Sequence, residues 1–308
     1  MRNIYEVQKS NKLKSAVIVA LFVVFVALAT YVLTKALGVY VGYEPSELGF
    51  VGVALILSGF SSFIGYYFSD QIILGISGAR PADKKRDFTF YTVAENISIG
   101  AGIPIPKLYV IADSAPNAFA TGRDPEHAAI CVTVGLLEKL DRTELEGVIA
   151  HEMSHIRNYD TRLMSVVSVM VGLIALLGDW LLRATWFGGR KSDNDKGGAG
   201  SIFLVLGIVF AILSPIIGQL IQLAISRRRE FTADAGSVSL TRQPSGLISA
   251  LTKISLDKEA LEVANKATAH LYICSPFKNK KGEVSWFANL FNTHPPISDR
   301  INVLKEMT

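Results

Sequence analysis

Residues 151–155 read His-Glu-Met-Ser-His, an H-E-x-x-H pattern in a segment that is expected to be helical. Side chains four positions apart lie on one face of a helix, so the imidazoles of His151 and His155 can reach a single metal ion. Glu152 lies beside them, where its carboxylate could take a proton from a water molecule at the metal. Because this pattern also arises by chance, its surroundings decide whether it is a metal site.

A zinc ion bound by two histidines needs a third protein ligand. Residues 230–234 read Glu-Phe-Thr-Ala-Asp and are expected on a second helix. Glu230 is the candidate third ligand, and Asp234, one turn later, could orient a ligating histidine through its second ring nitrogen. The alternative is that both carboxylates belong to a solvated face beside the three arginines at 227–229, and the residue types alone favour neither interpretation.

Long apolar runs dominate the 308-residue chain, which is 50% hydrophobic and 19% charged, with a mean hydropathy of +0.34. The uncharged runs 15–34 and 48–68 are each long enough to cross about 30 Å of hydrocarbon as a helix. A buried core helix or a cleaved signal peptide fits the first run less well. The runs 163–178 and 197–226 are weaker candidates, because the former is short and the latter contains polar residues; a partly inserted hairpin is the alternative.

Basic residues cluster beside these runs, which accounts for the net charge of +4 without a nucleic-acid partner. The first run is preceded by Arg2, Lys9, Lys12 and Lys14. The second is followed by Lys84, Lys85 and Arg86, and the fourth by Arg227, Arg228 and Arg229. The positive-inside rule therefore puts both termini and the segment 69–162 in the cytoplasm. Four further basic residues between the third and fourth runs weaken the asymmetry slightly.

The chain divides into four parts: a pair of transmembrane helices (1–68), a soluble segment with the H-E-x-x-H helix (69–162), a hydrophobic hairpin (163–226) and a second soluble segment (227–308). Short strands are expected at 106–112, 117–121 and 128–134. A helix should begin at Asp141, with Glu144 as its capping partner, and end near Asn158 or Asp160. Further helices are expected at 226–240, at 244–271 and after 293–296. Cys131 and Cys274 lack metal-site spacing and are expected in the core, and His127 and His270 belong to no recognisable site.

The motifs HEMSH (151–155), EFTAD (230–234), NAFATG (117–122) and THPP (293–296), the last followed by Arg300, closely resemble those of HtpX-type membrane zinc metalloproteases, relatives of the prenyl-protein (CAAX) endopeptidases. The resemblance covers nearly the whole chain, including the two pairs of apolar runs. It implies a mainly α membrane protein with four transmembrane helices and a cytoplasmic α+β zincin domain of the gluzincin type.

The resemblance also implies roles for individual residues. His151, His155 and Glu230 would hold one Zn²⁺, which acidifies water and polarises a carbonyl group. Glu152 would accept the proton of the attacking water and pass it to the leaving amine. The candidate donors to the developing oxyanion are His294 and Arg300, although a proline-anchored turn and a surface arginine would explain them as well.

Residues Asn117, Ala118, Phe119 and Ala120 would form an edge strand that pairs with an extended substrate, although a plain sheet strand is the alternative. Main-chain pairing of this kind would make selectivity broad.

The leading interpretation is a zinc endopeptidase of the cell inner membrane that cuts misfolded or damaged membrane proteins at cytoplasmic segments, a quality-control and stress-response role implied by the resemblance. The alternatives are a processing protease for lipid-modified C-terminal peptides and a non-enzymatic membrane scaffold or transporter that binds no zinc. The expected partners are unfolded or membrane polypeptides and the lipid bilayer. Homo-oligomers and self-cleavage are left open.

Overall fold

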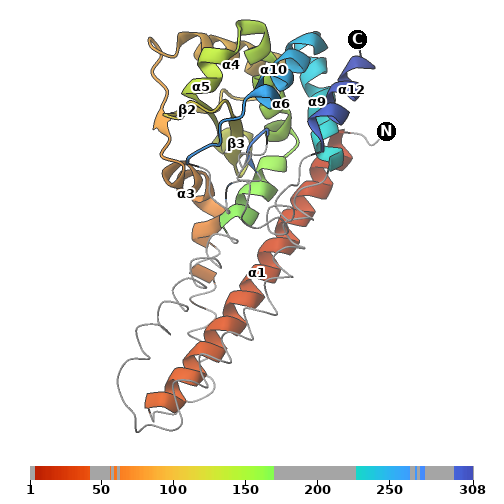
Figure 1. Cartoon of the computed structure of the whole chain (residues 1–308). Coiled ribbons are helices and arrows are strands. Elements are labelled where there is room, and N and C mark those ends of the chain that lie inside the picture. The colour runs from red at the N-terminus through yellow and green to blue at the C-terminus, as the bar shows by residue number, and fades with distance from the viewer. Residues whose placement is uncertain are drawn as a thin grey trace.

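The computed structural model describes residues 4–41, 56, 59–60, 63–169, 227–263, 268, 271–274 and 295–307. The long helix α1 (Ile4–Val41) begins beside the rest of the domain and projects away from it, and it contains the whole run 15–34 (Figure 1). Among the described residues, no helix combines the length and apolar character that a membrane crossing requires. The expected runs 48–68, 163–178 and 197–226 lie wholly or mostly outside the described residues.

The other elements alternate between helices and short strands. In chain order they are α3 (Ser69–Ile76), β1 (Arg80–Pro81), α4 (Phe88–Ala101), β2 (Lys107–Ile111), β3 (Ala118–Gly122), the 3-10 turn η1 (Pro125–His127), β4 (Ala128–Thr133), α5 (Val134–Lys139), α6 (Arg142–Arg157), α9 (Arg227–Thr241), α10 (Pro244–Leu256) and α12 (Ile297–Lys305).

The four strands form one mixed sheet in the order β1-β2-β4-β3. β2 pairs in parallel with β4, whereas β1 and β3 pair antiparallel with their neighbours. The strands expected at 106–112, 117–121 and 128–134 are confirmed to within one residue at each end. Among the described strands, β3 lies at one edge of this sheet.

Both faces of the sheet are buried. Alternate residues of each strand point to opposite faces, and each face packs against its own hydrophobic core. Val110 and Ile130 face a core shared with α4, α6 and α10, whereas Ile111 and Cys131 face a second core that includes Leu74 of α3. The reduced, buried Cys131 and Cys274 agree with the prediction that they are core residues. The sheet thus provides a rigid layer against which the H-E-x-x-H helix packs.

α6 begins as expected. Asp141 is its N-cap, and the capping box is complete: the Asp141 carboxylate accepts from the Glu144 N–H at 2.9 Å, and the Glu144 carboxylate accepts from the Asp141 N–H at 2.8 Å. Glu144 also bonds Ser249 and Lys253 of α10. The cap therefore fixes both the start of the metal-site helix and its contact with α10.

The helix expected over 244–271 is shorter than predicted, because α10 ends at Leu256. Polar contacts to the first soluble segment favour an extended chain after that point. Asp257 is 2.6 Å from the Lys139 ammonium, Glu259 accepts a hydrogen bond from Ser114, and the N–H of Glu262 donates to Asp113. These contacts join the two parts of the domain that the hydrophobic hairpin separates in sequence.

Gly147 lets α6 and α10 approach closely. A methyl group on this residue would lie 2.7 Å from the Leu247 nitrogen and 2.9 Å from its Cα, both backbone atoms. Replacing Gly147 with alanine should force the two helices apart and destabilise the protein by about 1–3 kcal/mol or more. Thermal unfolding of the detergent-solubilised protein measures the effect. As a control, Gly100→Ala on α4 meets no atom within 4 Å and should be neutral or slightly stabilising.

Candidate metal centre and its relatives

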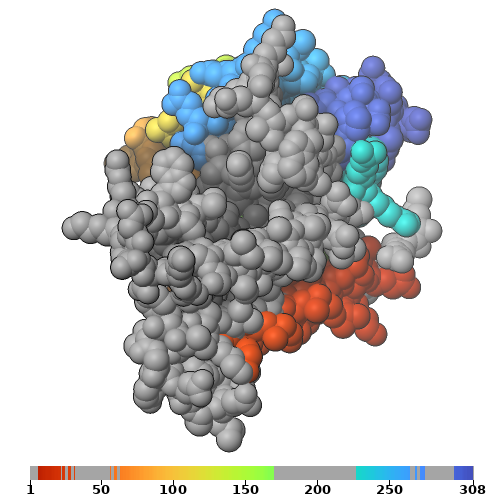
Figure 2. Space-filling view, turned by 60° about the horizontal axis from the view of Figure 1, so that its bottom comes forward, coloured from red at the N-terminus to blue at the C-terminus, as the bar shows by residue number. Residues whose placement is uncertain are grey.

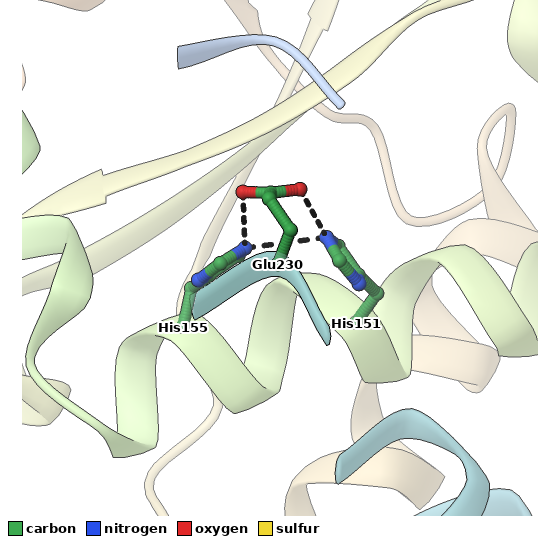
Figure 3. Close-up of side chains that lie close together, drawn as sticks. All are labelled: His151, His155 and Glu230. Atoms are coloured by element: carbon green, nitrogen blue, oxygen red, sulfur yellow. Dashed lines mark hydrogen bonds and ion pairs between the residues drawn. The ribbon is translucent and has the colours of Figure 1, made fainter. Parts of the chain in front are cut away.

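Three buried side chains from two helices converge on one point. His151 and His155 extend from the same face of α6, and Glu230 reaches them from α9 (Figure 3). Their ligand atoms all lie within 4.8 Å of one another. The two Nε2 atoms are 3.2 Å apart, and the Glu230 carboxylate oxygens lie 3.7 Å from that of His151 and 3.6 Å from that of His155.

These spacings fit a tetrahedral cation. Ligand atoms about 2.1 Å from a tetrahedral zinc ion are separated by about 3.4 Å, close to the three observed distances. Two imidazole nitrogens and one carboxylate oxygen are also the donor set of many catalytic zinc sites, in which the fourth position is left to water or substrate. The donor types and the spacing of the three residues therefore fit a zinc ion.

Each histidine is oriented by a carboxylate on its other ring nitrogen. His151 Nδ1 is 2.9 Å from Asp234 Oδ1, and His155 Nδ1 is 3.0 Å from Asp160 Oδ2. Such contacts fix the ring and leave Nε2 for the metal. The contact of Asp234 with a histidine is the one expected from the sequence.

Asp160 had been expected only to end the helix. Its role depends on the turn after Arg157, in which Tyr159 adopts a positive φ of 60° and the chain then resumes a helix at 160. No local pattern of residue types signals that this turn brings a carboxylate back to His155.

Close packing of α9 on α6 brings Glu230 within reach of the histidines. Gly236 faces Ser154, the residue before His155, and a methyl group on Gly236 would collide with the Ser154 hydroxyl oxygen. Ser237 donates a hydrogen bond of 2.8 Å to the Gly147 carbonyl. Small residues on both helices therefore set the distance between the two parts of the donor set.

Arg300 of α12 is fully buried next to this group. Its Nε and Nη2 donate to the two Asp234 oxygens at 2.9 and 2.7 Å, and Nη1 donates to the Ile273 carbonyl at 3.0 Å. Nη1 is also 3.5 Å from Glu230. The arginine thus lies beside the three clustered donors, and its role as an oxyanion donor stays a prediction. His294 lies outside the described residues.

The carboxylates around His151 and His155 favour the protonated forms of both imidazoles. Burial and the Arg300 charge oppose protonation of His151, but its hydrogen bond with Asp234 and the nearby Glu230 carboxylate outweigh them and raise its pKa to about 9. Burial likewise opposes the charged form of His155, yet its hydrogen bond with Asp160 contributes to a raised pKa.

Glu152 is buried beside the two histidines. Burial raises its pKa, although the positive charges of His151 and His155 act in the opposite direction. A carboxylate whose pKa is shifted towards neutrality is suited to accept and return a proton near pH 7.

The four residues expected to bind substrate belong to or precede the edge strand, and all are buried. Phe119 points into the core, where its ring centroid is 5.1 Å from that of Tyr272. The Asn117 amide donates to the Cys274 carbonyl at 3.0 Å, and the Ile273 N–H donates to the Ala118 carbonyl at 2.9 Å. A short piece of the chain therefore already lies against the beginning of β3.

His127, which was assigned to no site, is partly exposed and pairs with Asp124 at 2.6 Å. His270 lies outside the described residues.

Comparison with known proteins identifies the family of the chain. The profile of peptidase family M48 matches residues 85–308. A protease HtpX homolog of Dictyoglomus thermophilum is 45% identical over 303 residues, which is 98% of this chain and 94% of the relative. One of Caldanaerobacter subterraneus is 41% identical over 309 residues, which is 100% and 99% of the two chains. The crystal structure of S. mikatae Ste24p aligns with 97% of this chain and 66% of its own, at 17% identity and a TM-score of 0.43. The chain thus belongs to peptidase family M48 as a homologue of the protease HtpX, a metallopeptidase with its metal site at His151, His155 and Glu230.

Proposed function

We propose that this metallopeptidase is a zinc endopeptidase that cuts misfolded or damaged membrane proteins at cytoplasmic segments. The observation that carries the proposal is the convergence of His151, His155 and Glu230 beside the buried carboxylate of Glu152. Metal-dependent hydrolysis needs both parts: a site for a Lewis acid and a base beside it.

The roles of the individual residues follow from this arrangement. A bound zinc ion would polarise the scissile carbonyl and lower the pKa of water. Glu152 accepts the proton of the attacking water and returns it to the nitrogen of the leaving amine. Asp234 and Asp160 hold the two histidine rings in the orientation that directs Nε2 to the metal. Arg300 and His294 are proposed to stabilise the oxyanion, and Arg300 also holds Asp234 against His151.

Among the described strands, the side of β3 that faces away from β4 pairs with no further strand, which supports main-chain recognition of an extended substrate. In an antiparallel pair, alternate residues direct their N–H and C=O groups to the partner strand. Asn117 and Phe119 face β4 in this way, which turns the main-chain groups of Ala118 and Ala120 outward. Because Ile273 already bonds Ala118, we propose that a substrate strand pairs at Ala120. Recognition through the main chain would accept many sequences, as a protease for unfolded polypeptides requires.

The proposed location is the inner membrane, with both termini and the protease domain in the cytoplasm. It is supported by the four apolar runs and by the basic residues that flank them. An even number of crossings between residues 163 and 226 would keep His155 and Glu230 on the same side of the membrane, as their contact requires. A membrane-bound protease of this kind meets membrane proteins and their cytoplasmic loops at high local concentration.

Cleavage in reconstituted vesicles tests the substrate class. The purified full-length protein is offered a membrane protein in its folded form, the same protein carrying a destabilising core substitution, and a peptide with or without a C-terminal prenyl group. We expect cuts in cytoplasmic loops of the destabilised protein, with the folded form intact and Glu152→Gln inactive on all substrates. Preferential cleavage of the prenylated peptide would instead support the processing alternative.

A further inference from the structure

The first three turns of α1 lie against the end of the metal-site helix. The Gln8 amide donates to the Arg157 carbonyl at 2.9 Å, and the Asn11 amide donates to the Asn158 carbonyl at the same distance. Figures 1 and 2 show the start of α1 on the side of the domain that carries α9 and α12. Carbonyl groups at a helix end have no partner within the helix, so α1 supplies donors that the end of α6 needs.

Asn11 makes a second contact that leads to the metal site. Its Nδ2 lies 2.8 Å from Asp160 Oδ1, and the other oxygen of the same carboxylate lies 3.0 Å from His155 Nδ1. Asn11 is 3% exposed and Asp160 is 1% exposed, so water competes little for either group. A continuous chain of hydrogen bonds thus runs from the N-terminal helix through one carboxylate to a metal ligand.

The turn that presents Asp160 needs this support. Tyr159, the residue before it, has a φ of 60°, a conformation that costs a non-glycine residue about 1–2 kcal/mol. Asn11 bonds the residues on both sides of Tyr159, and the ammonium of Lys12 lies 4.1 Å from the centre of the tyrosine ring. α1 therefore holds the backbone of this turn and the side chain that it presents.

We propose that Asn11 is a positioning residue of the metal centre. By fixing Asp160 it fixes the ring of His155, so the N-terminal helix is part of the metal-binding apparatus as well as a candidate membrane anchor. The inference rests on the proposed zinc site. It concerns the affinity and lifetime of the bound metal rather than the choice of substrate.

Zinc affinity of the full-length protein in detergent tests the proposal, measured by competition with a chromogenic chelator. Loss of a residue that orients a ligand typically weakens metal binding about 10–100-fold, which is the expected effect of Asp160→Asn. Asn11 is one hydrogen bond further from the ligand than Asp160 is. Asn11→Ala is therefore expected to weaken zinc affinity about three- to tenfold and to release zinc faster to excess chelator. Asn11→Asp, which sets a carboxylate against Asp160, should weaken binding at least as much.

A double-mutant cycle separates positioning from a general effect on folding. If Asn11 acts through Asp160, adding Asn11→Ala to Asp160→Asn should change the affinity by less than about twofold. An equal loss in both backgrounds would overturn the proposal, as would an Asn11→Ala protein that binds zinc like wild type.

Two neighbours on α1 serve as controls. Gln8→Ala removes a donor to the same helix end, and Ser15→Ala removes a buried hydroxyl that donates to the Asn11 carbonyl at 2.8 Å. Both should retain wild-type affinity. If Gln8→Ala lowered zinc affinity as much as Asn11→Ala, the effect would come from capping of the end of α6. The proposal that Asn11 acts through Asp160 would then be wrong. The cycle needs no activity measurement, so a wild-type protein that binds zinc but cleaves nothing would defeat the proposed function and leave this test intact.

Discussion

Replacing Glu152 with glutamine is expected to abolish peptide-bond cleavage while the protein still binds its metal. Glutamine has nearly the same shape but cannot accept the proton of the attacking water. Loss of a general base typically lowers the rate about 10²–10⁴-fold. Because Glu152 is not among the three clustered metal donors, the variant should retain about one zinc ion per chain. Hydrolysis of an unfolded model protein and metal analysis of the same samples measure the two quantities.

A glutamate elsewhere on the helix provides a matched control. Glu146 lies on the outer face of α6 and pairs with Arg142 at 3.0 Å. Glu146→Gln should keep both the activity and the metal. Zinc removal and readdition should abolish and then restore cleavage by wild type but have no effect on Glu152→Gln. Residual activity of Glu152→Gln near the wild-type level would assign the base to another residue.

The metal site could be predicted from the sequence because its elements follow local rules. The spacing of His151 and His155 is that of one helix face, and the Asp141–Glu144 pair defines where the helix begins. The assignment of Glu230 as a metal ligand needed further information, because it lies 75 or more residues after the two histidines and no local rule brings it to α6. The residue types allowed either a metal ligand or a solvated surface residue, and the resemblance to a known family favoured the ligand. The structure agrees with the resemblance.

The parts that escaped prediction depend on contacts between distant segments. Asp160 orients His155 only because Tyr159 takes a left-handed conformation, and Asn11 reaches Asp160 from a helix 149 residues away. α10 ends at Leu256 because the following acidic residues find partners near residues 113–139. Helical periodicity carries no information about such partners, so a pattern-based boundary at 271 was wrong. The very short β1 was missed for the same reason, because only its pairing with β2 defines it.

For Arg300, the motif indicates a position near the metal site but does not indicate which side chains the arginine contacts. The resemblance to a known family implied a position near the metal and a role as donor to the oxyanion. In the structure its guanidinium holds both oxygens of Asp234, which in turn contacts His151. Burial opposes the charge of Asp234, but Arg300 and His151 outweigh it and keep the pKa of that carboxyl low. Arg300 is therefore expected to stabilise the fold and orient His151 together.

Replacing Arg300 with methionine should consequently cause the largest loss of stability of any variant considered. The buried Asp234 would lose its main counter-charge, and breaking a buried pair in this way costs about 3–5 kcal/mol. In thermal unfolding of the metal-free protein, this corresponds to a decrease in Tm on the order of 10 °C. Arg300→Lys should fall between wild type and Arg300→Met, because lysine keeps the charge but cannot donate to both carboxylate oxygens in a planar fork.

The exposed Arg142, which pairs with Glu146 on the surface of α6, is the control for loss of an arginine. Surface pairs contribute about 0–1 kcal/mol, so Arg142→Met should leave the Tm nearly unchanged. If the cost of Arg300→Met comes from the unpaired carboxylate, adding Asp234→Asn should recover part of the lost stability, since the buried negative charge is then removed. Equal Tm values for Arg300→Met and Arg142→Met would contradict this account, because the buried pair would then contribute no more than a surface contact.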